Sequence, residues 1–95
     1  MFIVLLKFST NRDQAGKFIE GHREWLQDGF DDGTFLLAGS IEPGTGGAVV
    51  AHNTTLAALQ ERVNGDPFVE GKVVEVEIVE ISPSRADRQL EFLLG

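Results

Sequence analysis

The spacing of apolar residues is typical of strands in some segments and of helices in others, and the order of these segments is the feature that most constrains the fold. The run Phe2–Phe8 is almost entirely apolar and partly β-branched, which predicts a buried strand. From 12 to 32 the apolar residues recur at helical spacing, and Gly33 follows where a helix would end. Two short apolar segments, 34–39 and 48–51, then flank a turn rich in glycine, so they predict a hairpin.

The second half of the chain again has a helical pattern followed by a strand pattern. A short stripe formed by Leu56, Leu59 and Val63 precedes a stretch at 72–81 in which Val or Ile alternates with Glu. The whole order is therefore β-α-β-β-α-β. This is the split βαβ order of the ferredoxin-like fold, so we predict an α+β protein with a four-stranded antiparallel sheet and two helices on one of its faces.

Composition narrows the partners that such a domain can have. The chain has 95 residues, enough for one domain, and a formal charge of −7 with no run of Lys or Arg. This charge repels phosphate backbones and anionic lipids, so we expect neither a nucleic-acid nor a membrane partner. The absence of cysteine excludes thiolate metal sites and fits a reducing cytoplasm. We expect no cofactor and no bound metal ion.

His22 is the residue that points most directly to chemistry. It lies four residues after Phe18 and four before Leu26, in the middle of the apolar stripe of the first predicted helix. A buried imidazole needs a hydrogen-bond partner, because an unpaired polar group costs about 1–3 kcal/mol. One interpretation is a core histidine bonded to a carbonyl. A partner that left one ring nitrogen free would instead permit general acid/base chemistry near neutral pH.

Asp66 is the candidate partner of this histidine. It precedes Pro67, which suits the first position of a helical turn, so its carboxylate is expected to cap that turn. In a βαββαβ fold the two helices lie side by side on the sheet, which could bring the end of the second helix close to His22. A carboxylate there would accept a hydrogen bond from one imidazole nitrogen and select the tautomer. Both roles of Asp66 remain open at this point.

Five short motifs are spread over most of the chain. They are Met1–Leu6, His22–Leu26, Phe35–Gly39, Gly46-Gly47, and Asp66–Val69 followed by Gly71. In their order and spacing the chain resembles the YCII-related (YciI-like) family of the dimeric α+β barrel group. The resemblance implies a ferredoxin-like fold that dimerises through its sheets, and an active-site cleft whose His and Asp correspond to His22 and Asp66. The family that it resembles also contains one kind of enzyme that removes chloride from a chlorinated hydroxyhydroquinone, using that His and Asp for proton transfer.

The chain continues past the last predicted strand. Residues 1–83 make up the predicted domain, and 84–95 form a C-terminal extension in which Leu90, Phe92 and Leu94 are apolar. A solvated tail would not carry so many apolar side chains, so we expect the extension to pack on a neighbouring subunit of a homodimer or higher homo-oligomer.

Two functions are compatible with these residues. In the first, a small cyclic or aromatic acid enters a cleft, and His22 acts as general acid/base in a cofactor-free elimination or isomerisation while Asp66 orients it. Ser40 stands where many family members have proline, and its hydroxyl would stabilise developing charge on a substrate oxygen or only complete a turn. In the second, the cleft binds a metabolite or the domain only assembles with partners, and His22 and Asp66 form a structural pair.

Arg23 and His52 are secondary candidates. Arg23 follows His22 on an adjacent helix face, where it can bind an anionic substrate at the cleft edge or pair with Glu20 or Gln27; we favour the surface pairing. His52 follows the third predicted strand, and we expect it to be an exposed edge residue rather than a metal ligand.

Overall fold

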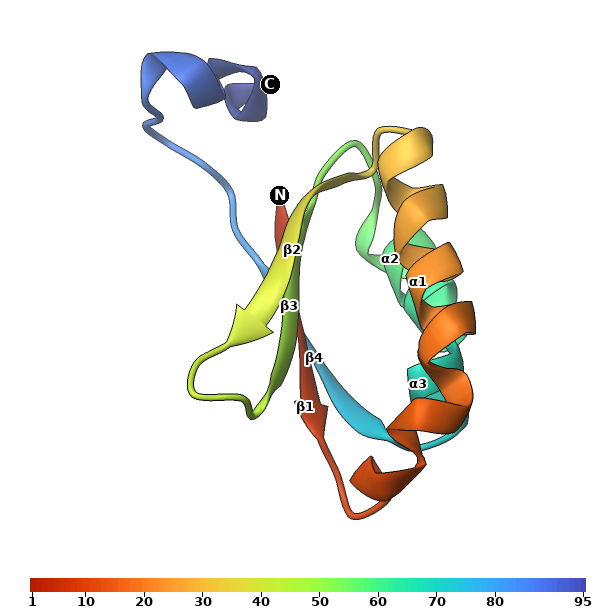
Figure 1. Cartoon of the computed structure of the whole chain (residues 1–95). Helices are drawn as coiled ribbons and strands as arrows, with labels where there is room; N and C mark the ends of the chain where they lie inside the picture. Colours follow the sequence, from red (N-terminus) through yellow and green to blue (C-terminus); the bar gives the residue numbers. More distant parts are fainter.

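The structure is a computed structural model that describes residues 1–95 (Figure 1). The helices and strands are β1 (Phe2–Phe8), α1 (Ala15–Asp31), β2 (Phe35–Ile41), β3 (Gly46–Ala51), α2 (Leu56–Asn64), α3 (Pro67–Glu70) and β4 (Val74–Glu80). Two 3₁₀ helices are added, η1 (Arg12–Gln14) before α1 and η2 (Arg88–Leu94) at the C-terminus. The β-α-β-β-α-β order is confirmed, with the short α3 inserted before the last strand. None of these helices is both long and apolar enough to cross a membrane.

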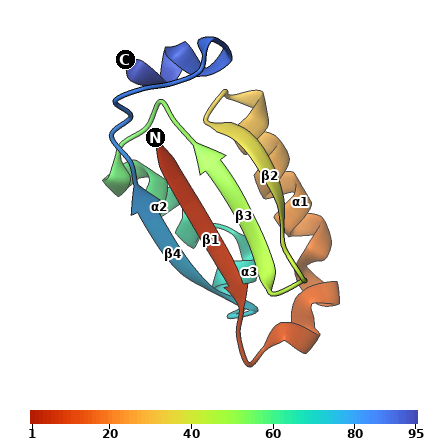
Figure 2. The same cartoon turned by 90° about the vertical axis from the view of Figure 1, so that its left-hand side faces the viewer.

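The four strands form one antiparallel sheet in the order β2-β3-β1-β4. The apolar strand β1 is central, and its Val4 lies opposite Val49 of β3 and Ile78 of β4. The helices cover one face of the sheet and leave the other face open (Figures 1 and 2). The predicted ferredoxin-like α+β architecture is therefore confirmed.

The core lies between the sheet and the helices. Alternate residues of β1 point toward the helices, and Phe2, Val4 and Leu6 are all buried. Leu59 and Val63 of α2 are fully buried in the same cluster, which holds 12 residues. Burial of each such side chain stabilises the fold by about 1.5–3 kcal/mol, so this cluster keeps the helices on the sheet.

The start of the first helix differs from the sequence prediction. The expected single helix over 12–32 is divided into η1 and α1. Asn11 precedes η1 without capping it, because its Nδ2 donates instead to the carbonyl oxygen of Gly71 at 2.8 Å. At the other end Gly33 follows α1 with a φ of 82°, a left-handed conformation that glycine adopts without a steric penalty.

The face of the sheet that the helices leave open is partly apolar, because Lys7, Glu75 and Glu77 share it with apolar side chains. Ile3 of β1 lies opposite Val79 of β4 and Val50 of β3 on this face, and Val50 also lies opposite Leu37 of β2. Leu37 is 56% exposed, a high value for a side chain of this kind in a strand. An exposed apolar patch of this type often marks an interface.

The C-terminal extension projects beyond the end of the sheet, on the side away from the helices (Figure 1). No residue of η2 is buried, and Leu90 and Phe92 are about half-exposed. The ring of Phe92 lies edge-on to His52, with 5.5 Å between the ring centroids. His52 is therefore half-buried rather than exposed, which the sequence prediction missed because the contact crosses 40 residues of chain.

Candidate active site

The structure brings His22 and Asp66 together. Nδ1 of His22, on α1, lies 2.8 Å from Oδ1 of Asp66, which stands between α2 and α3. A carboxylate can only accept a hydrogen bond, so Nδ1 carries the proton and its N–H donates a hydrogen bond to Oδ1. In the neutral ring this leaves Nε2 as an acceptor that can take up a proton.

Local turn chemistry places the carboxylate of Asp66. Asp66 is the N-cap of α3, and its Oδ1 accepts a hydrogen bond from the backbone N–H of Phe68 at 3.0 Å. Pro67 occupies the first position of this turn, which fits because proline has no N–H to leave unpaired. The predicted cap is confirmed, and the same oxygen accepts from His22. The side chain of Asp66 is fully buried, and its Oδ2 has no partner within the chain.

Aromatic stacking orients the imidazole of His22. Its ring lies parallel to that of Phe68, with 4.0 Å between centroids and 7° between planes, and 5.9 Å from the ring of Trp25. The stack determines the plane of the imidazole, and the bond to Asp66 determines which nitrogen points inward. The close approach of α1 to α3 depends on Gly21, because a Cβ there would lie only 2.9 Å from Cγ of Pro67.

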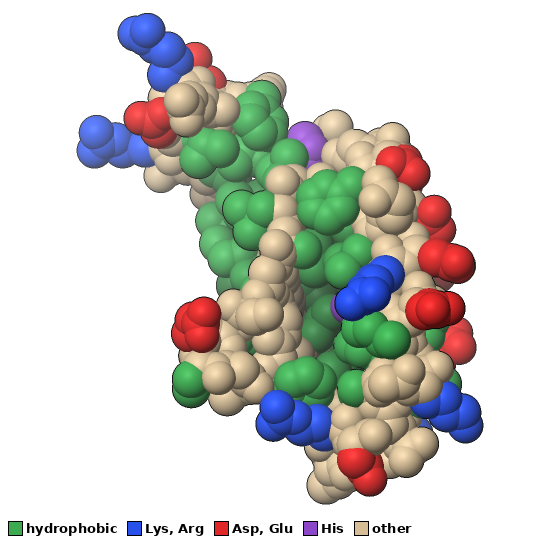
Figure 3. Space-filling model, in the orientation of Figure 1, with side chains coloured by type: hydrophobic (Ala, Val, Ile, Leu, Met, Phe, Trp, Pro, Cys, Tyr) green, Lys and Arg blue, Asp and Glu red, His purple; other side chains and the backbone are tan.

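A cavity of about 300 Å³ lies beside this pair, between α1 and the sheet. Nine of its 14 lining residues are hydrophobic, and the hollow with its green hydrophobic wall is visible in Figure 3. His22 lines the cavity. Its Nε2 has no hydrogen-bond partner within the chain and is not fully buried. The free nitrogen of the pair is therefore accessible. The lining residues are Leu6, Phe8, Ile19, His22, Leu26, Ala38, Gly39, Ser40, Gly46, Gly47, Ala48, Val49, Phe68 and Val74.

Ser40 lines the same cavity as His22, from the opposite wall. It lies on β2, opposite Gly47 of β3. The pairing of β2 with β3 shifts register between Phe35 and Leu37, and one extra residue in a strand reverses the faces of all residues after it. Phe35 faces the helices and would share its face with odd-numbered residues of β2, but the shift turns Ser40 toward the cavity. The sequence carried no clear signal of this bulge.

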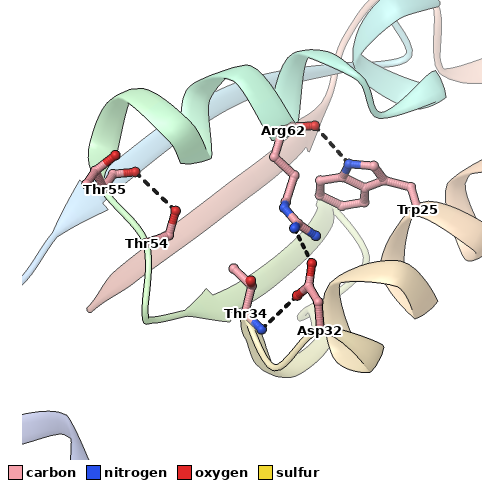
Figure 4. A network of polar contacts seen from close by, with 6 residues as sticks. All are labelled: Trp25, Asp32, Thr34, Thr54, Thr55 and Arg62. Atoms are coloured by element: carbon pink, nitrogen blue, oxygen red, sulfur yellow. Dashed lines mark hydrogen bonds and ion pairs between the residues drawn. The ribbon is translucent and has the colours of Figure 1, made fainter.

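A second polar network joins the ends of α1 and α2 on the side of Trp25 (Figure 4). Nε1 of Trp25 donates to the carbonyl oxygen of Arg62 at 2.9 Å, and the guanidinium of Arg62 forms an ion pair with Asp32. Oδ1 of Asp32 also accepts from the backbone N–H of Thr34 at 3.0 Å. Hydrogen bonding by the Thr34 side chain, by Arg62 and by this N–H lowers the pKa of Asp32 from 3.8 to about 2. The network holds Trp25, and through it one side of His22, in place.

The family of the chain is settled by its match to a family model. Residues 1–82 match the model of the YCII-related domain. The chain belongs to the YCII-related family. The resemblance seen in the five sequence motifs is thereby confirmed, and the match covers nearly all of the predicted domain 1–83.

The YCII-related domain is similar to a solved enzyme structure. That structure is the 5-chloro-2-hydroxyhydroquinone dehydrochlorinase (TftG) from Burkholderia phenoliruptrix AC1100, in complex with 2,5-dihydroxybenzoquinone. The TM-score is 0.72 over 84% of this chain and 91% of that chain, with 12% sequence identity. At this identity the likeness shows a common fold. No curated protein matches the chain in sequence.

No group of three or more His, Cys, Asp or Glu side chains in the domain is arranged to hold a metal ion. The titratable groups of the site are the two members of the pair alone, because the cavity lining contains no Asp, Glu, Lys or Arg. The arrangement can therefore move a proton at Nε2 of His22 beside an apolar space.

Proposed function

We propose that this YCII-related domain is a small-molecule enzyme in which His22 and Asp66 carry out cofactor-free general acid/base chemistry. The reaction is an elimination or isomerisation of a small cyclic or aromatic acid. The observation that carries the proposal is the 2.8 Å bond between Asp66 and Nδ1 of His22, a residue that lines an apolar cavity and whose Nε2 this bond leaves free. A positioned acid/base of this kind contributes about 10²–10⁴-fold to a rate.

The proton follows a simple path. Nε2 of His22 takes a proton from a carbon or hydroxyl of the substrate, and the imidazolium that forms is stabilised by the carboxylate of Asp66. In an elimination, the electrons of the broken bond expel a leaving group from a conjugated carbon, and the proton passes from Nε2 to solvent. In an isomerisation the same proton returns to another carbon of the substrate. The hydroxyl of Ser40 donates to the substrate oxygen on which charge develops.

Two further observations support an unsaturated ring as the substrate body. The cavity volume of about 300 Å³ and its mostly hydrophobic lining suit a small planar ring, whose faces need apolar neighbours. The similar fold of the dehydrochlorinase provides a precedent, since the name of that enzyme describes an elimination on a ring.

A non-catalytic binding domain is the second candidate. The observation that favours it is the stacking of His22 on Phe68, because a ring held so closely, with a side chain only 13% exposed, also fits a structural pair. In that case the cavity would bind a metabolite without changing it, and replacement of His22 would lower stability alone.

Exchange of substrate protons with solvent separates the two candidates. Substituted hydroquinones, including 5-chloro-2-hydroxyhydroquinone, and small cyclic acids are incubated with the domain in D₂O, and deuterium incorporation and chloride release are followed by NMR and ion chromatography. We expect turnover by the wild type, none by His22→Ala, and a rate reduced about 10-fold or more by Ser40→Ala. His52→Ala is the matched control, because it removes the other histidine. Equal turnover by His22→Ala and wild type would refute the catalytic role.

We further propose that the domain acts as a homodimer that pairs through the open face of its sheet. The apolar residues Ile3, Leu37 and Val79 on that face support this arrangement, since a second copy would cover them. The extension 84–95 would then pack on the partner subunit with the exposed side chain of Phe92.

A further inference from the structure

Arg23 is an unpaired cation beside the cavity. Ile19 and Leu26 of α1 line the cavity, and Arg23 lies about 40° beyond Ile19 around the helix, at the edge of the stripe that faces the cavity. The residue is exposed, and none of the ion pairs of the chain includes it. The predicted surface pairing with Glu20 or Gln27 is wrong, since Gln27 donates to a carboxylate of its own helix at 2.8 Å and Arg23 has no ion-pair partner. The guanidinium is thus available to a ligand.

The electrostatics of the surroundings make this one charge important. The cavity lining has no Lys, Arg, Asp or Glu, and the chain as a whole carries −7, so most of the surface repels anions. Figure 3 shows a Lys or Arg side chain lying across the hollow. Arg12 is another basic residue near the cavity, but its guanidinium lies 4.4 Å from the ring centroid of Phe8 and donates to the carbonyl oxygen of Gly44 at 3.4 Å. Arg23 has no such partner.

We infer that Arg23 is a specificity residue that binds the anionic group of the ligand, so that the cavity selects rings bearing a carboxylate. The ring lies against the apolar lining, and the carboxylate remains at the rim, where the fork of the guanidinium can bind both of its oxygens. Because Arg23 and His22 lie on the same helix, this anchor would set the position of the ring relative to Nε2. The inference rests on the proposed site but concerns binding, so it can be tested without turnover.

The test compares two probes that differ in charge. Benzoate and benzamide have nearly the same shape, and their binding to the full chain is measured by NMR titration of backbone amides. We expect the wild type to bind benzoate more tightly than benzamide. Arg23→Gln should weaken benzoate about tenfold and change benzamide less than about twofold, because only the anion gains a charge-assisted bond. The control Arg88→Gln removes one positive charge from η2 and should change neither.

Several results would overturn the inference. One is equal benzoate affinity in Arg23→Gln and wild type, and another is a wild type that does not prefer benzoate to benzamide. A third is no benzoate binding by the wild type at about 10 mM, a concentration well above typical substrate affinities. The last is a loss of benzoate affinity in Arg88→Gln equal to that in Arg23→Gln. The proposed enzymatic function fails separately. If the domain only binds its ligand, the wild type has no activity that His22→Asn could abolish, while benzoate binding by the domain still depends on Arg23.

Discussion

The coupling between His22 and Asp66 can be measured as a free energy of unfolding. Asp66→Asn keeps the cap on Phe68 but replaces a charged acceptor with a neutral amide. The lost charge assistance is about 1 kcal/mol, and the amide nitrogen only takes the place of Oδ2, which already lacks a partner. We therefore expect Asp66→Asn to destabilise the domain by about 1 kcal/mol, a measurable share of a total stability of about 5–15 kcal/mol.

His22→Phe completes the comparison. A phenyl ring keeps the 4.0 Å stack on Phe68 but removes the Nδ1 donor, so the buried carboxylate retains only its backbone partner. Each single variant loses the bond between His22 and Asp66, so the sum of their losses in free energy of unfolding counts this bond twice. The double variant His22→Phe/Asp66→Asn should therefore be more stable than that sum predicts. We expect a coupling energy of about 1–3 kcal/mol.

The assay is urea denaturation at pH 7, followed by the fluorescence of Trp25, the only tryptophan, whose ring lies beside His22. Glu20→Gln, on the exposed face of α1, is a control that should change the free energy of unfolding by less than about 0.5 kcal/mol. A coupling energy within about 0.3 kcal/mol of zero would show that the two side chains act independently, and would refute the reasoning.

Three other predictions follow from different parts of the molecule. The folded-state pKa of Asp32 is lowered to about 2, so its ionised form adds stability above pH 4 that is lost as the pH falls through 2. The difference in urea midpoint between wild type and Asp32→Asn should therefore shrink as the pH falls over this range. A difference that stays constant would contradict this prediction. Gly29→Ala should cost about 1–3 kcal/mol in thermal denaturation, because its Cβ would lie 2.1 Å from Cδ2 of Phe35, whereas Gly16→Ala, with open space around it, should stabilise α1 by about 0.5–1 kcal/mol. Leu37→Glu, on the open face of the sheet, should convert a homodimer to monomers in light scattering at micromolar concentration, and a wild type that is already monomeric would refute the dimer.

The elements and the family could be predicted because their signals are local. The apolar run of β1 and the alternation of β4 identified these two segments as strands. The cap at Asp66 followed from the proline after it. Spacing on a helix likewise predicted that His22 faces inward, since it depends only on the residues one turn away.

The parts that sequence reasoning missed depend on contacts between distant segments. The bulge that turns Ser40 toward the cavity arises from the pairing of β2 with β3, and no residue of β2 by itself marks it. The ion pair of Arg62 with Asp32 joins residues 30 positions apart. The stack of His22 on Phe68 requires α1 and α3 to approach closely. Gly21 permits this approach, but the apolar periodicity of α1 does not reveal that role.

The protonation of the His22 ring tests the central claim most directly. Nitrogen-15 NMR of histidine-labelled protein distinguishes the two neutral tautomers, and His52→Gln assigns the signals because the chain has only two histidines. We predict that in the neutral ring Nδ1 of His22 carries the proton and Nε2 is bare, and that added 2,5-dihydroxybenzoquinone shifts the Nε2 signal. A proton on Nε2 with Nδ1 bare would contradict the bond to Asp66 and, with it, the proposed base.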